Sequence, residues 1–273
     1  MATNVSPAQL QAGDVLLMQG DSLISDFIRI FDQGQYSHAA IFDGHNVVEM
    51  LAQGTTVRSL EESVVDTRFV DVYRFVGSDG TPLGSPGLER QPVLDRIQHY
   101  VDAGEQYGYE QILLLALLCA TRREAQENLT PVQALILRRI LDSAAEVVAT
   151  MIHAGHTPMI CSELVYKCYT EAGSRYAILV RGADLPAAAP LGALESLAPG
   201  RAAAAPAAQS AFQEEASRFL LNYAVAKRHN VAAREFATAA TPAAIVAASA
   251  VADFVTPHDL ETSPSLQLAG TLA

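Results

Sequence analysis

The chain has 273 residues, of which 50% are hydrophobic and 18% are charged, and this composition excludes a globally disordered protein. Its formal net charge of -12 argues against a nucleic-acid partner, because the few Lys and Arg residues form no cluster that could follow a phosphate backbone. The first residues show no signal peptide, and the longest apolar run, 112–120, is too short to span a bilayer. We therefore expect a cytoplasmic protein without a transmembrane segment, unless a signal-independent route exports it.

The first part of the sequence predicts a β-rich section. A strand at 13–18 is followed by an amphipathic helix that Asp21 or Ser22 can cap. Short segments of strand-like composition come next, separated by turns such as Asp43-Gly44. This pattern is typical of an antiparallel meander. Its predicted strands are 37–42, 46–51, 55–60 and 69–75.

Helices follow this β-rich section. Apolar residues recur at helical spacing in several segments, Pro131 suits a first helical position and Gly173 suits a helix end. The predicted helices are 92–103, 112–120, 131–152 and 159–172.

The composition then changes. Residues 177–252 are rich in Ala and Pro, and their aromatic residues lie at helical spacing in one stretch, which indicates a helical insertion or lid joined by Pro-containing linkers. Residues 263–268 favour an edge strand that returns to the main domain.

Cys161 is the first residue that points to chemistry. The three cysteines form no disulfide framework and no zinc-binding pattern, so we expect neither a metal nor another cofactor. Cys161 begins a predicted helix, where the helix dipole and free N–H groups lower a thiol pKa from about 8.5 towards roughly 3.5–7.5. The alternative is that Cys161, like Cys119 and Cys168, is a small buried core residue.

His38 and Glu49 form the second chemical feature. His38 heads a predicted strand, and a hairpin that closes near Gly44 pairs residues 38–42 with 46–50, which brings His38 near Glu49. A carboxylate among apolar strand residues is costly unless it has a partner. An imidazole held by a carboxylate is the orienting arrangement of a catalytic triad. The alternative for His38 is a hydrogen-bonded strand histidine without a catalytic role.

Four segments together resemble a known family, in the order histidine, glutamate, cysteine. They are Gly13-Asp14-Val15-Leu16-Leu17, Tyr36-Ser37-His38-Ala39-Ala40-Ile41-Phe42-Asp43-Gly44, Glu49 and Ile160-Cys161-Ser162-Glu163-Leu164-Val165-Tyr166. The sequence is similar here to the permuted NlpC-type papain-like cysteine hydrolases, particularly the YiiX-like branch. The resemblance implies Cys161 as nucleophile, His38 as base and Glu49 as orienting residue, with Tyr36 and Asp14 lining the substrate site.

The same resemblance implies an α+β, permuted papain-like fold in which the cysteine helix packs on a small antiparallel sheet. We predict three parts: a catalytic core at 10–176, the Ala-rich insertion or lid at 177–252, and a C-terminal segment at 253–273 that returns to the core. The resemblance does not account for the insertion.

The function that these residues predict is a bacterial thiol hydrolase or acyltransferase that acts through an acyl-enzyme. The resemblance implies a small amide or acyl ester of cell-envelope material as the substrate, either a peptidoglycan peptide or a lipid. The alternative is a non-catalytic interaction module on a papain-like scaffold. The sequence leaves open the choice between amide and ester, the acceptor and the oligomeric state.

Overall fold

The computed structural model describes residues 4–104, 113–116, 118, 131–154, 159–180 and 255–273. The chain divides into two compact units. The first unit contains the chain termini and all of the residues that the sequence marks as functional. In the second unit, the longest described element is helix α6 (Pro131–Ala154), which agrees with the helix predicted at 131–152. Residues 113–116 and 118 of the helix predicted at 112–120 are described and helical, whereas the insertion predicted at 177–252, apart from its first four residues, lies outside the described residues.

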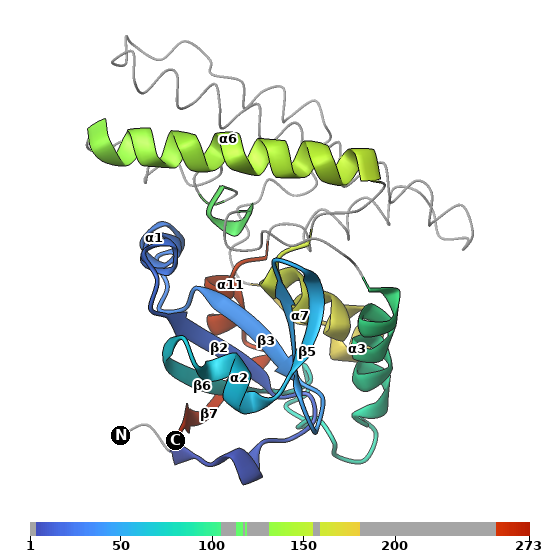
Figure 1. The fold of residues 1–273 in the computed structure, drawn as a ribbon. Helices are drawn as coiled ribbons and strands as arrows, with labels where there is room; N and C mark the ends of the chain where they lie inside the picture. The colour runs from blue at the N-terminus through green and yellow to red at the C-terminus, as the bar shows by residue number, and fades with distance from the viewer. Residues whose placement is uncertain (1–3, 105–112, 117, 119–130, 155–158, 181–254) are drawn as a thin grey trace. The chain divides into compact units, whose positions relative to one another are not determined.

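The first unit is built on a mixed seven-stranded sheet with the order β1-β7-β6-β2-β3-β4-β5 (Figure 1). Its strands are β1 (Asn4–Val5), β2 (Val15–Gly20), β3 (His38–Phe42), β4 (Val47–Leu51), β5 (Gly54–Arg58), β6 (Thr67–Phe75) and β7 (Leu266–Leu272). All neighbours are antiparallel except β1 and β7, which run parallel. The unit is therefore α+β, as predicted.

The predicted meander is only partly correct. Strands β3, β4 and β5 do follow one another through the sheet, but β6 pairs with β2 instead of β5. Helix α2 (Leu60–Val64) separates β5 from β6 in the chain and allows β6 to cross to the other side of β2. Strand β2 is thereby placed at the centre of the sheet, where its residues from Val15 to Met18 are buried.

The C-terminal segment returns to the sheet, as predicted, but not at its edge. Helix α11 (Pro257–Glu261) leads into β7, which lies between β6 and the short strand β1. Figure 1 shows both C-terminal elements in red against the blue N-terminal strands. The N-terminal residues Asn4 and Val5 cover what would otherwise be the open edge of β7, and an uncovered edge is prone to pair with other chains.

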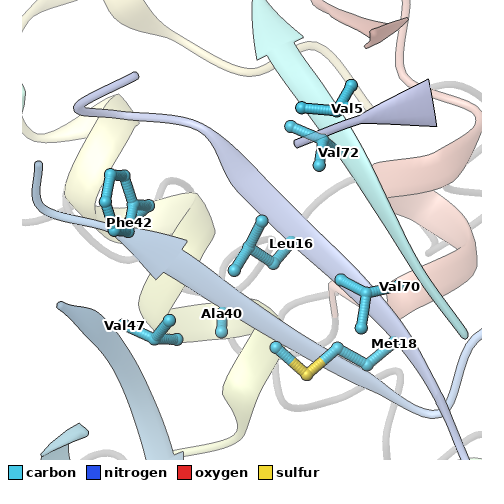
Figure 2. Packing of buried hydrophobic residues seen from close by; sticks show 8 residues of the cluster. All are labelled: Val5, Leu16, Met18, Ala40, Phe42, Val47, Val70 and Val72. Carbon is cyan, nitrogen blue, oxygen red and sulfur yellow. The ribbon is translucent and has the colours of Figure 1, made fainter. Parts of the chain in front are cut away.

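The two faces of the sheet carry different groups of residues. One face, which we call the core face, carries a cluster of buried apolar side chains (Figure 2). The cluster consists of Val5, Leu16, Met18, Ala40, Phe42, Val47, Val70 and Val72. Leu60 and Val64 of α2 pack against it, so α2 covers this face.

The opposite face, which we call the helix face, is covered by α7 (Cys161–Thr170). Tyr169 stacks on Phe75 with a distance of 4.9 Å between ring centroids, and strand alternation from Val72 places Phe75 on this face. Helix α7 packs against β3, β4 and α3 (Gln91–Ala103). The sequence predicted α3 at 92–103 and α7 at 159–172, so both helices are confirmed to within two residues.

Helix α1 (Leu23–Asp32) connects β2 to β3 at one end of the sheet. Ser22 caps it by accepting a hydrogen bond from the backbone N–H of Ser25. Such a cap stabilises a helix by about 1 kcal/mol. Ser22, rather than Asp21, is thus the capping residue, and α1 delivers the chain to the start of β3, where His38 lies.

Candidate active site

His38 and Glu49 meet on the core face of the sheet. In the antiparallel register His38 pairs with Met18, and Ala40 pairs with Glu49. His38 and Glu49 are therefore diagonal neighbours on one face. Nε2 of His38 lies 2.7 Å from Oε2 of Glu49, and both residues are buried, with 8% and 1% of their surface exposed. The predicted proximity of His38 and Glu49 is confirmed.

The register that produces this contact differs by one residue from the predicted one. Pairing 38–42 with 46–50 would set Glu49 opposite Ala39, on the other face from His38. Instead Phe42 pairs with Val47, because Asp43 accepts hydrogen bonds from the backbone N–H groups of His45 and Asn46 and holds the turn one residue longer. This longer turn moves Glu49 onto the face of His38.

The second oxygen of Glu49 is held by two further residues. The Ser63 hydroxyl of α2 donates to Oε1 over 3.0 Å, and Nη1 of Arg58 at the end of β5 lies 3.5 Å from the same oxygen. The carboxylate thus has partners on both of its oxygens. Sequence reasoning missed Ser63 and Arg58. The capping box of Ser59 and Glu62 could have predicted α2, but it carries no information about which strand residue faces Ser63.

The electrostatics of Glu49 favour an ionised carboxylate. Burial acts to raise the pKa of Glu49, and it is the largest single influence. The hydrogen bond and charge of His38 act in the opposite direction, followed by Ser63 and Arg58. Together these partners hold the pKa of Glu49 below its ordinary value, so the carboxylate is charged near neutral pH and acts as a hydrogen-bond acceptor.

Cys161 is the first residue of α7 and is fully buried. Ile160 occupies the position before it, and no side chain there caps the first N–H groups of the helix. Those N–H groups, together with the helix dipole, favour negative charge at this end of α7. Cys168, seven residues later, is also fully buried, and burial followed by the charge of Glu171 raises the pKa of its thiol. The two buried thiols therefore differ in helix position, not in exposure.

The orientation of α7 relates Cys161 to His38. The Tyr169 hydroxyl, in the last turn of α7, donates to the carbonyl oxygen of Gly13, and the N–H of Gly13 donates to the carbonyl of Phe42. The end of α7 thus lies beside the end of β3, and Cys161 lies toward the end of β3 that begins with His38. The pairing of Cys161 and His38 as nucleophile and base stays a prediction.

Tyr36 is buried beside β6. Its hydroxyl donates to Oδ2 of Asp71 over 2.7 Å and lies 3.1 Å from the hydroxyl of Tyr73. Burial, followed by these two partners, raises the pKa of Tyr36. Its hydroxyl is thus engaged within the core, and a place for Tyr36 in a substrate site stays a prediction.

Asp14 lies at the far end of β2 from the partner of His38. The backbone N–H of Gln11 donates to one carboxylate oxygen over 2.8 Å, and Nε of Arg74 donates to the other over 3.2 Å. Met18 lies four residue steps along the strand from Asp14, which amounts to about 13 Å. The structure therefore does not bring Asp14 to His38, and its contacts hold the N-terminal segment against β6.

Within the described ranges, no group of His, Cys, Asp and Glu side chains is arranged to hold a metal ion. No described helix combines the length and the apolar character needed to cross a bilayer.

No family model matches the chain, and neither does any curated protein sequence. Among solved structures, the chain is similar to the crystal structure of the metalloprotein YiiX from Escherichia coli O157:H7, with 14% identity over 97% of each chain and a TM-score of 0.43. The structure of the chain itself shows an α+β fold with a mixed seven-stranded sheet and a buried, hydrogen-bonded pair of His38 and Glu49.

Proposed function

We propose that the chain is a thiol hydrolase or acyltransferase of the permuted papain-like kind, with Cys161 as nucleophile, His38 as base and Glu49 as orienting residue. The observation that supports this most is the buried hydrogen bond between Nε2 of His38 and Oε2 of Glu49 at the head of β3. A buried, ionised carboxylate on one nitrogen of a histidine fixes the tautomer and the orientation of the ring.

In this proposal the two nitrogens of His38 have separate roles. With Nε2–H donating to Glu49, the neutral imidazole carries its lone pair on Nδ1, so Nδ1 is the atom that would accept the thiol proton. The negative Glu49 stabilises the imidazolium that forms. The N–H groups at the start of α7 stabilise the thiolate and would then donate to the oxyanion of the tetrahedral intermediate.

The reaction follows from these roles. The thiolate of Cys161 adds to the carbonyl carbon of an amide or ester, and collapse of the tetrahedral intermediate breaks the bond to the leaving group. Nδ1–H of His38 gives its proton to the departing amine or alkoxide, which leaves a thioester on Cys161. His38 then takes a proton from water or from another acceptor, whose oxygen or nitrogen attacks the thioester and releases the thiol.

The substrate class stays divided between a peptide amide of peptidoglycan and the acyl ester of a lipid. Both are cleaved by the same steps, so the residues of the proposed triad do not separate them. We expect an apolar lid at 177–252 to favour one of the two substrates. This segment lies almost entirely outside the described residues.

The test is to trap the acyl-enzyme. We would incubate the protein briefly with a total lipid extract or with a muropeptide digest, quench in acid, and measure the intact mass and the modified peptide. A thioester adduct on Cys161 is expected from one of the two mixtures and identifies the acyl group. Cys161→Ala should give no adduct, and Cys168→Ala should behave as the wild type.

A different result would favour the non-catalytic scaffold. If neither mixture modifies Cys161, and substrate bonds in both remain intact after long incubation, the proposed activity is wrong.

A further inference from the structure

The surroundings of Glu49 contain a feature that the proposed triad does not use. Oε2 faces His38, while Oε1 receives the Ser63 hydroxyl and lies near Arg58. An ionised carboxylate offers only acceptors, so the hydroxyl of Ser63 must be the donor. Ser63 is itself buried, with 7% of its surface exposed, so water competes poorly for this hydrogen bond.

We infer that Ser63 is a positioning residue of the proposed site: its hydroxyl fixes the rotation of the Glu49 carboxylate so that Oε2 stays directed at Nε2 of His38. The inference rests on the proposed function, since it assigns Ser63 a role in orienting the base.

Ser63 is positioned by helix α2, which is stabilised by hydrogen bonds between residues close together in the sequence. The Ser59 hydroxyl accepts from the N–H of Glu62, and the Glu62 carboxylate accepts from the N–H of Ser59, which closes a capping box. The N–H of Ser63 donates to the carbonyl of Ser59 in the first helical turn. Nη2 of Arg58 also donates to the carbonyl oxygen of Glu62, which ties the end of β5 to the helix.

Ser63 contributes more to this arrangement than Arg58. The Arg58 side chain is 31% exposed and its nearest nitrogen is 3.5 Å from Oε1, so solvent screens its attraction. The Ser63 hydrogen bond is shorter, at 3.0 Å, and fully inside the protein. Among the described residues, two charged or titratable side chains contact Glu49: His38 from β3 and Arg58 from β5.

The first measurement concerns His38 itself and does not depend on any activity. Nitrogen-15 NMR of the imidazole reports which nitrogen carries the proton. In the wild type we expect the neutral ring to be protonated at Nε2, and in Ser63→Ala a mixture of the two tautomers because Glu49 can rotate. Ser63→Thr keeps a hydroxyl and should restore the single tautomer.

The second measurement follows the reactivity of Cys161. The rate of alkylation by iodoacetamide, read by peptide mapping across pH 4–9, should fall roughly tenfold or more in Ser63→Ala, as expected for loss of a hydrogen bond to a charged group. The acid limb of the profile should also move to higher pH, because Glu49 loses one of the donors that keep it ionised.

Ser59→Ala is the matched control. It removes one hydrogen bond of the α2 cap without removing a contact to Glu49, and Leu60 and Val64 still pack α2 against the core cluster, so it should lower thermal stability but leave the His38 tautomer and the Cys161 profile near those of the wild type. The inference is overturned if Ser63→Ala leaves both readouts unchanged, or if Ser59→Ala reproduces them. If the tautomer responds to Ser63→Ala but Cys161 forms no acyl-enzyme, the positioning role stands and the proposed function is wrong.

Discussion

Two buried carboxylates of the first unit, Glu49 and Asp14, have pKa values shifted in opposite directions. Both are almost without exposed surface, and each has an arginine partner. Burial raises the pKa of Asp14 above its ordinary value, although Gln11 and Arg74 oppose it. Burial also acts to raise the pKa of Glu49, but His38 and its other partners overcome it and lower the pKa. The imidazole makes the difference, since it supplies both a short hydrogen bond and a charge.

Asp14 and Glu49 also contact different parts of the first unit. Asp14 joins the N-terminal segment to β6 at one end of β2, whereas Glu49 holds a histidine near the end where α7 begins. We expect the carboxylate that holds a histidine to matter for proton transfer, and the carboxylate that contacts Gln11 and Arg74 to matter for the fold. The following predictions change one carboxylate, or its partner, and leave the other in place.

The largest effect is expected from removing the partner of Glu49. His38→Ala should lower turnover by about a thousandfold or more, as Cys161→Ala should, because nucleophile and base act as one unit. Steady-state kinetics on the substrate identified by the acyl-enzyme would measure both variants, singly and combined. The double variant should be no worse than either single one. Additive losses would mean that His38 and Cys161 act separately.

The two carboxylates themselves should differ in their effect on activity. Glu49→Gln should reduce turnover by roughly 10- to 100-fold, since it removes a charged hydrogen-bond partner but no reacting atom. Asp14→Asn should leave turnover close to that of the wild type, because Asp14 has no contact with the proposed triad. Circular dichroism and thermal unfolding would show that each variant is folded. An equal loss in both would remove the distinction between site and scaffold.

The smallest effect is on the pH dependence of unfolding. The folded pKa of Glu49 is lowered, so the stability it contributes is present above its unfolded pKa and is lost as the pH falls through the folded pKa. The folded pKa of Asp14 is raised, so the folded state gains stability relative to the unfolded state as Asp14 takes up its proton. In urea unfolding from pH 7 to pH 3, Glu49→Gln should therefore flatten the acid loss and Asp14→Asn should steepen it. Reversed slopes would contradict the assigned pKa directions.

The sequence by itself determined the local features of the site. Turn residues at Asp43 and Gly44 between two strand-like segments predicted the hairpin that brings His38 near Glu49, and Gly44 does adopt a left-handed φ of 109°. The start of a helix at Cys161 followed from its apolar spacing. These features depend on residues close together in the chain, so local propensity was enough to predict them.

Only the tertiary structure determined which residues surround the pair of His38 and Glu49. The sequence placed β6 in a meander, and it gave no sign of Ser63 on Glu49. The crossing of β6 to the far side of β2 and the insertion of β7 between β6 and β1 are set by long-range pairing and shared core packing. Such pairing depends on burying a whole face of the sheet at once, so no single segment of the sequence predicts it.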